Sequence, residues 1–206
     1  MTVQIDVWSD FVCPFCYAAV CGLDQLKPTH DFSIRWHAYE LRPAGSPPMP
    51  AAYLRRIEES RPQLALMMKE RYNVDVVFGP AGTNSRLALI GDKVAEASGE
   101  AIGQAYHRAV LRAYWEQGRD ISQPSVLREI AESVGLDGDA FEAALRDPRY
   151  EAQVDADVAQ AYEYQMNGVP ALVFGGRYLV MGAQPTETFA QVIERVEAET
   201  SAKAGI

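Results

Sequence analysis

The most restrictive feature of this sequence is a pair of cysteines two residues apart, Cys13-Pro14-Phe15-Cys16, near its beginning. A short β-forming run, Val3–Trp8, precedes the pair, and an amphipathic stretch, Tyr17–Leu26, follows it. This order predicts a strand, a tight turn and a helix, with Cys13 at the helix N-terminus. The proline after Cys13 suits the first helical position, because its missing N–H would have no partner there. We therefore expect the pair at a strand–helix junction of an α/β domain.

A cysteine at the N-terminus of a helix has altered chemistry. Unpaired backbone N–H groups and the positive end of the helix dipole stabilise a thiolate there. The pKa of Cys13 is therefore expected to be lower than that of a free thiol. Cys16 is close enough along the chain to form a disulfide bond with Cys13, and such a pair can carry out thiol–disulfide exchange.

Composition excludes several other classes of protein. The chain has 206 residues, 48% of them hydrophobic and 23% charged, with a formal net charge of −9. This acidic balance argues against a general nucleic-acid-binding protein and against binding to anionic membrane surfaces.

The sequence opens without a basic-then-apolar signal, and no apolar run approaches the roughly 20 residues of a membrane span. We expect a cytoplasmic protein, in which a CxxC pair is catalytic or metal-binding rather than structural.

The remainder of the chain has a helix-rich centre between strand-rich ends. Residues 32–37 alternate between apolar and polar and predict a second strand, after which a proline-rich loop at 43–50 closes a βαβ unit. The centre has strand character only at 74–78, and helices are expected at 84–94, 103–117, 123–134, 139–145 and 150–166.

Strand character returns near the end of the chain. Residues 171–174 and 177–181 flank Gly175-Gly176, which predicts a hairpin because glycine readily adopts the positive φ of a two-residue turn. A last amphipathic helix is expected at 186–199. The chain therefore ends in a ββα unit.

Four motifs occur in this order along nearly the whole chain: Ser9-Asp10-Phe11-Val12-Cys13-Pro14-Phe15-Cys16-Tyr17, Asn84-Ser85-Arg86-Leu87-Ala88, Gly168-Val169-Pro170-Ala171 and Gly182-Ala183-Gln184-Pro185. With these motifs the chain resembles the DsbA-like oxidoreductases, and within them the FrnE group. The resemblance implies an α/β, thioredoxin-like fold with a large all-helical insertion between the βαβ and ββα units. Its domains would be 1–50 with 168–206, and 51–167.

The same resemblance implies a protein thiol–disulfide oxidoreductase or isomerase. Cys13 would be the nucleophile, Cys16 the resolving thiol and Pro170 a cis-proline that faces them. The Val169 backbone would pair with a substrate strand, and Pro14 and Phe15 would lie beside it. Protein thiols or disulfides would be the substrates, with glutathione or a thioredoxin-type reductant as redox partner, and exchange itself needs no diffusible cofactor.

Two positions depart from the family pattern. Phe15 stands where the DsbA group proper has a histidine, and a phenyl ring cannot donate a hydrogen bond to the thiolate, so a strongly oxidising protein is not expected. Val7 stands where thioredoxin-like proteins often have a buried carboxylate, six residues before the first cysteine. Asp6 and Asp10 are the remaining candidates for the proton acceptor of Cys16.

Other functions fit parts of the sequence. A zinc site is disfavoured because Cys21, His30, His37 and His107 have no recognisable ligand spacing, and both His37 and His107 are expected to be packing or surface residues. Kappa-class glutathione transferases and hydroxychromene-carboxylate isomerases resemble this architecture too, but have a serine at the first cysteine position. A non-enzymatic holdase chaperone that uses the helical domain is a third alternative.

Secondary roles are open for several aromatic residues and for Cys21. Trp8, Phe11, Phe15 and Tyr39 could form an apolar rim that binds unfolded segments, although Trp8 is expected in the core and Phe15 at the surface. Cys21 is expected to be buried on the first helix. Five helical residues separate Cα atoms by roughly 8–9 Å, whereas a disulfide tolerates about 7 Å. A Cys16–Cys21 redox pair would therefore require the helix to unwind.

Overall fold

The structure is a computed structural model that describes residues 2–204. These residues form two compact units, one made of residues 2–39 and 155–204 and the other of residues 40–154. The dividing points differ from the expected 50/51 and 167/168. The second one lies inside helix α7 (Pro148–Glu163), because Asp157 on this helix is hydrogen-bonded to the sheet of the first unit.

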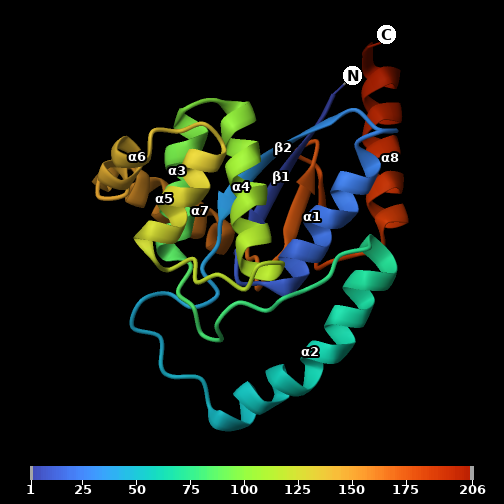
Figure 1. The fold of residues 1–206 in the computed structure, drawn as a ribbon. Coiled ribbons are helices and arrows are strands. Elements are labelled where there is room, and N and C mark those ends of the chain that lie inside the picture. The colour runs from blue at the N-terminus through green and yellow to red at the C-terminus, as the bar shows by residue number, and fades with distance from the viewer. Residues whose placement is uncertain (1, 205–206) are drawn as a thin grey trace. The chain divides into compact units, whose positions relative to one another are not determined.

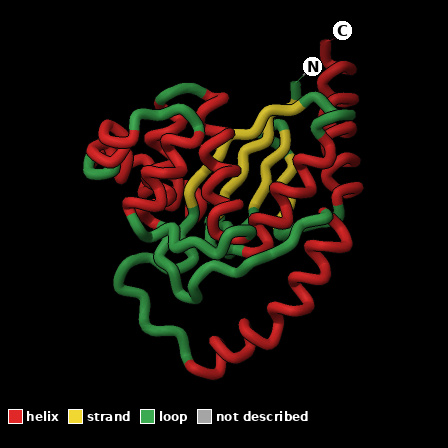
Figure 2. The backbone as a smooth tube through the Cα atoms, viewed as in Figure 1, coloured by secondary structure: helices red, strands yellow, loops and turns green. Residues whose placement is uncertain are grey.

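The first unit is built on a four-stranded sheet with the strand order β2-β1-β3-β4. The strands are β1 (Val3–Ser9), β2 (Phe32–Ala38), β3 (Ala171–Phe174) and β4 (Tyr178–Met181). Strands β1 and β2 are parallel, whereas β3 is antiparallel to both β1 and β4 (Figure 1). Figure 2 shows the strands side by side in yellow. This topology is the thioredoxin-like fold that the βαβ and ββα patterns predicted.

Helices α1 (Pro14–Leu26) and α8 (Thr186–Ala204) cover one face of this sheet (Figure 1). Ile5 in β1, paired with Ile34 and Phe174 on either side, points into this core. The ring of Phe174 lies 6.1 Å from that of Phe189 in α8. Alternate β1 residues therefore face the other way, and Trp8 lies on the opposite face beside His37 and Ala171.

A tight turn joins β3 to β4 as the glycine pair predicted. Gly175 and Gly176 have φ angles of 56° and 66°, a region that other residues rarely adopt. The N–H of Arg177 donates to the carbonyl oxygen of Phe174 over 3.0 Å and closes the turn.

The second unit is helical. It contains α2 (Ala51–Tyr72), α3 (Arg86–Ala97), α4 (Glu100–Trp115), α5 (Pro124–Ser133), α6 (Gly138–Ala144) and the beginning of α7. The predicted helices are confirmed with end shifts of a few residues, and α2 is a helix that the sequence analysis did not delimit. Asn84 precedes α3, and its side-chain oxygen accepts the N–H of Arg86 over 3.0 Å.

The expected strand at 74–78 is wrong. Its backbone groups bond to the ends of helices instead of to another strand: Val74 donates to Met68 over 3.3 Å, and Val77 donates to Trp115 over 2.7 Å.

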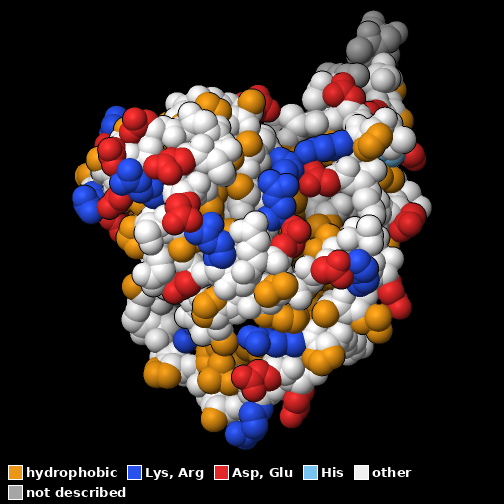
Figure 3. Space-filling view, in the orientation of Figure 1, with side chains coloured by type: hydrophobic (Ala, Val, Ile, Leu, Met, Phe, Trp, Pro, Cys, Tyr) orange, Lys and Arg blue, Asp and Glu red, His pale blue; other side chains and the backbone are white. Residues whose placement is uncertain are grey.

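Within residues 2–204, no helix combines the length and apolarity needed to cross a membrane. Acidic and basic side chains are interspersed on the face shown in Figure 3.

Candidate active site

Cys13 occupies the junction between β1 and α1. It has an extended backbone, with φ −91° and ψ 115°, and Pro14 opens the helix. Its carbonyl oxygen accepts the N–H groups of Cys16 and Tyr17 at 3.1 and 3.2 Å, which are the first hydrogen bonds of the helix. The predicted strand–turn–helix junction is therefore confirmed. Little of Cys13 is exposed, so the thiol lies where water screens charges weakly.

The surroundings of Cys13 stabilise its thiolate. A hydrogen bond from the Cys16 side chain contributes most to lowering the pKa of Cys13, and the backbone N–H groups of Cys16 and Phe15 lower it further. Burial and the negative charge of Asp10 act in the opposite direction, but the pKa of Cys13 stays below its ordinary value. The lowered pKa expected for a thiol at a helix N-terminus is thus present.

Cys16 has the opposite character. Cys16 is 0% exposed, and this burial is the main reason why the pKa of the Cys16 thiol is well above the ordinary value. The hydrogen bond that it gives to Cys13 and the charge of Cys13 raise its pKa further, while the Asp10 backbone and the Ser9 hydroxyl lower it slightly. The pair therefore consists of one acidic thiol and one that keeps its proton.

The segment before β3 returns the chain to this junction. The Cys13 thiol lies 3.6 Å from the carbonyl oxygen of Val169, and the Val169–Pro170 peptide bond is cis. Pro170 is buried, and its carbonyl oxygen accepts the N–H of Gly182 over 2.7 Å. Two of the sequence motifs, each containing an expected site residue, thus meet at one point.

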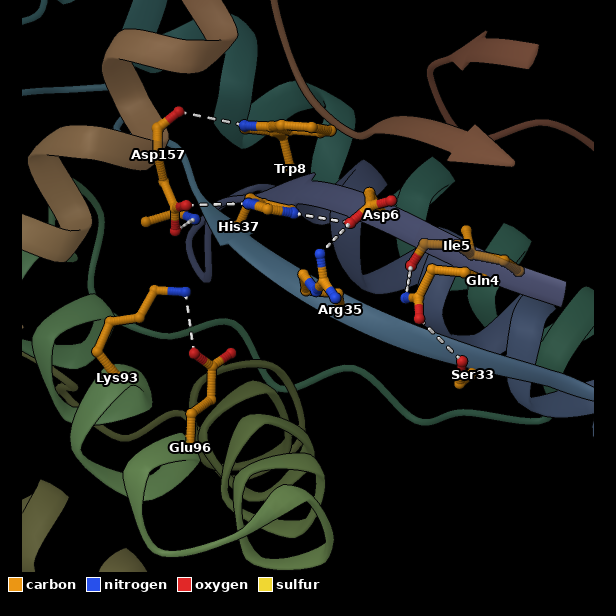
Figure 4. Close-up of polar contacts among 11 residues, drawn as sticks. Gln4, Ile5, Asp6, Trp8, Ser33, Arg35, His37, Lys93, Glu96 and Asp157 are labelled. Atoms are coloured by element: carbon orange, nitrogen blue, oxygen red, sulfur yellow. Dashed lines mark hydrogen bonds and ion pairs between the residues drawn. The ribbon is translucent and has the colours of Figure 1, made fainter. Parts of the chain in front are cut away.

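A polar network joins β1, β2 and α7 on the face of the sheet opposite to α1 and α8 (Figure 4). The ring nitrogens of His37 lie 2.9 Å from Asp157 Oδ1 and 3.0 Å from Asp6 Oδ1. The Trp8 indole stacks on His37 with ring centroids 4.2 Å apart, and its Nε1–H donates to the Asp157 carbonyl oxygen over 3.1 Å. This network attaches α7 to the sheet through Asp157, and the chain leads from α7 to Val169.

Of the two candidate proton acceptors, only Asp10 adjoins the cysteines. Val7 is buried in β1, and its neighbour Asp6 points to the opposite face, where it bonds to His37. Asp10 is 0% exposed, and its backbone oxygen accepts the N–H of Cys13 over 3.0 Å. The buried carboxylate of this site therefore comes from the turn rather than from the strand.

Comparison with known proteins agrees with this geometry. Residues 4–194 match the family model of the DSBA-like thioredoxin domain. The chain belongs to this family. It is 27% identical over 194 residues to the uncharacterized protein YwbO of Bacillus subtilis, covering 94% of this chain and 96% of that protein.

Two further similarities extend over most of the chain. A 2-hydroxychromene-2-carboxylate isomerase of Sphingobium xenophagum is 30% identical over 186 residues, covering 84% of this chain and 89% of that protein. The crystal structure of a probable DsbA oxidoreductase, SCO1869 of Streptomyces coelicolor, is 24% identical, with a TM-score of 0.80, and covers 96% of this chain and 91% of that chain.

The aromatic side chains of this DSBA-like protein only partly match the expected rim. Phe15 is 54% exposed and Trp8 is buried, as predicted. Phe11 and Tyr39 are buried as well, so the proposal that they line a rim is wrong. Tyr39 instead packs with Trp8 in the cluster that Val169 contacts.

The expectation that Cys21 is buried is also wrong. Helix α1 buries the side that includes Cys16 and Leu23, whereas Cys21 lies with Asp24 and Gln25 on the more exposed side. Five residues correspond to a rotation of about 140° around the helix, which separates Cys21 from Cys16. No disulfide bond joins any of the three cysteines, all of which lie in the described part of the chain.

His37 and His107 are packing residues of their own units, and His107 is buried with Nδ1 2.8 Å from Asp92 Oδ2. Among the side chains that the structure describes, no cluster of three or more His, Cys, Asp or Glu residues could hold a metal ion. Sequence reasoning did not identify Asp157, since no local pattern links a helical aspartate to a histidine 120 residues away.

Proposed function

We propose that this protein is a thiol–disulfide oxidoreductase of protein substrates, with Cys13 as nucleophile and Cys16 as resolving thiol. The observation that carries the proposal is that the two thiols of one CxxC pair have pKa values shifted in opposite directions. The pKa of Cys13 is lowered, whereas the pKa of the buried Cys16 is raised. A nucleophile must be ionised to attack, and a resolving thiol that stays protonated does not compete with it.

In the reductive direction, the Cys13 thiolate attacks one sulfur of a substrate disulfide. A bond forms between Cys13 and that sulfur, the substrate disulfide breaks, and the second substrate sulfur leaves as a thiolate that takes up a proton. Cys16 then attacks Cys13, and its proton passes to the first substrate sulfur, which leaves as a thiol. The substrate gains two electrons, and the protein becomes a Cys13–Cys16 disulfide. The oxidative direction is the reverse.

The Val169 carbonyl and the exposed Phe15 are proposed to contact the substrate chain. The carbonyl oxygen lies 3.6 Å from Cys13 Sγ, and it could pair with an extended segment while Phe15 and Pro14 pack against its side chains. Glutathione or a thioredoxin-type dithiol would return the pair to its reduced state. We propose the cytoplasm as the location, where such reductants keep thiols reduced.

The test is reduction of insulin disulfides together with reactivation of scrambled ribonuclease. We expect Cys13→Ser to abolish both activities and Cys16→Ser to trap substrates as mixed disulfides on Cys13. Cys21→Ser is the matched control, because it removes a thiol from the same helix, and it should retain both activities. Exchange activity that survives in Cys13→Ser would overturn the proposal.

A second candidate function rests on the similarity to the isomerase of Sphingobium xenophagum, which extends over most of both chains. A glutathione-dependent isomerase or transferase would use the thiol of glutathione instead of the thiols of the protein. Assays with glutathione and hydroxychromene carboxylate separate the two candidates. Isomerisation that persists when both Cys13 and Cys16 are changed to serine would favour the second function.

A further inference from the structure

The turn before α1 contains a buried carboxylate beside the cysteine pair, and its charge has a second consequence for this pair. Asp10 is 0% exposed. Its Oδ1 atom accepts the N–H of Val12 over 3.2 Å, and its backbone oxygen accepts the N–H of Cys13 over 3.0 Å. These two bonds place the carboxylate and the Cys13 thiol in one turn, three residues apart, at the N-terminus of the helix.

In the reduced protein the negative charge of Asp10 acts on the Cys13 thiol, and it raises the pKa of that thiol. The N-terminus of α1 stabilises whichever anion lies next to it, and like charges in a buried site repel each other more strongly than in water. In the oxidised protein the sulfur of Cys13 is neutral, so the repulsion from Asp10 disappears. The carboxylate therefore disfavours the reduced state relative to the disulfide.

Tyr39, an ionisable neighbour of Asp10, does not cancel this charge. Burial is the main reason why the pKa of the Tyr39 phenol is raised. The charges of Tyr162 and Asp10 raise this pKa further. The phenol is thus neutral near pH 7. The lowered pKa of Cys13 is the net result of the Cys16 side chain and the backbone N–H groups of Cys16 and Phe15, which act against burial and Asp10.

We propose that Asp10 is a positioning and charge-setting residue that shifts the Cys13–Cys16 pair towards the reducing end of its range. The inference rests on the proposed function, since it concerns the direction in which the same pair works. The relevant equilibrium is balanced with glutathione: the Cys13–Cys16 disulfide and two glutathione thiols give the dithiol and one glutathione disulfide. Asp10 would move this equilibrium towards the protein disulfide.

Asp10→Asn tests the proposal, because an asparagine oxygen can still accept the N–H of Val12 while the charge is removed. We expect a lower pKa of Cys13, measured from thiolate absorbance against pH. We also expect the glutathione equilibrium to shift at least about threefold towards the dithiol, which corresponds to about 14 mV at 29.6 mV per tenfold. Asp10→Ser also offers an oxygen acceptor without charge, and it serves if the first variant does not fold.

The matched control is Asp24→Asn, the same chemical change on α1, the helix that follows Asp10. Asp24 is partly exposed, and its Oδ1 atom lies 2.9 Å from Lys27 Nζ. Asp24→Asn should therefore leave the pKa of Cys13 and the glutathione equilibrium unchanged. An unchanged or raised pKa of Cys13 in Asp10→Asn, or the same shift in the control, would overturn the inference. Both measurements use only the protein and glutathione, so failure to reduce insulin would count against the proposed function and not against the role of Asp10.

Discussion

The thiol of Cys13 and the carbonyl oxygen of Val169 lie 3.6 Å apart although 156 residues separate them in the chain. One comes from the turn after β1 and the other from the segment before β3, the strand that pairs with β1. The pairing of β1 with β3 thus places the Cys13 thiol beside the backbone of Val169. The following predictions test the chemistry of this junction and the packing that supports it.

Cys13 should be the fast-alkylating thiol of the reduced protein near pH 7. Only the thiolate reacts, and the surroundings of Cys13 lower its pKa below the ordinary value of about 8.5. Iodoacetamide labelling followed by mass mapping measures the three rates separately. Cys21 is more exposed than Cys13, so the experiment distinguishes acidity from exposure. Equal rates at all three positions would contradict the assignment.

The two thiols should give the stability of the reduced protein opposite pH dependences. Cys13 has a lowered folded pKa, so its contribution is present above the unfolded pKa of about 8.5 and is lost as pH falls through the folded value. Cys16 has a raised folded pKa, so its contribution is present below about 8.5 and is lost as pH rises towards the folded value.

Above about pH 8.5 the free energy of unfolding should therefore fall by up to about 1.4 kcal/mol per pH unit because of Cys16. Urea denaturation of the reduced protein and of Cys16→Ser measures this decrease, since the difference between the two removes the contributions of groups outside the Cys13–Cys16 pair. The decrease should be absent in Cys16→Ser. Parallel curves for the two proteins would show that Cys16 titrates normally in the folded state.

Asp157→Ala should destabilise the first unit by about 1–3 kcal/mol, because it leaves the Nδ1 atom of the largely buried His37 and a backbone N–H without their partner. Asp157 Oδ1 lies 2.9 Å from His37 Nδ1, and Oδ2 accepts the N–H of Ala38 over 2.9 Å. The midpoint of urea denaturation is the measurement. Glu163→Ala, at an exposed position of the same helix, should change stability by less than about 0.5 kcal/mol.

Tyr106→Phe should leave the helical unit equally stable or make it more stable. The Tyr106 hydroxyl is buried and has no hydrogen-bond partner among residues 2–202, so its removal relieves a desolvation cost. Tyr114→Phe is the matched comparison, since the Tyr114 hydroxyl donates to Pro80 over 3.0 Å. This second change should cost about 0.5–1.5 kcal/mol. A larger loss for Tyr106→Phe than for Tyr114→Phe would indicate a bridging water at Tyr106.

Local features of the fold could be predicted because they depend on a few neighbouring residues. The apolar run Val3–Trp8, the proline after Cys13 and the amphipathic stretch behind it specify a strand–turn–helix junction by periodicity and by the free N–H groups of a helix start. The hairpin after Phe174 was equally predictable, since two adjacent glycines accept the positive φ of its turn.

Other features depended on how these elements pack. The sequence alone determined that Cys13 begins a helix and that Cys16 follows it, because short-range hydrogen bonds and side-chain periodicity are encoded within about one or two helical turns. Only the tertiary structure decided that Cys21 is partly exposed, that Asp157 bonds to His37, and that Asp10 is the carboxylate beside the thiols. The rotation of a helix about its axis and the burial of a loop side chain are set by contacts between segments far apart in the chain. Their free energies depend on the packed arrangement and not on local sequence.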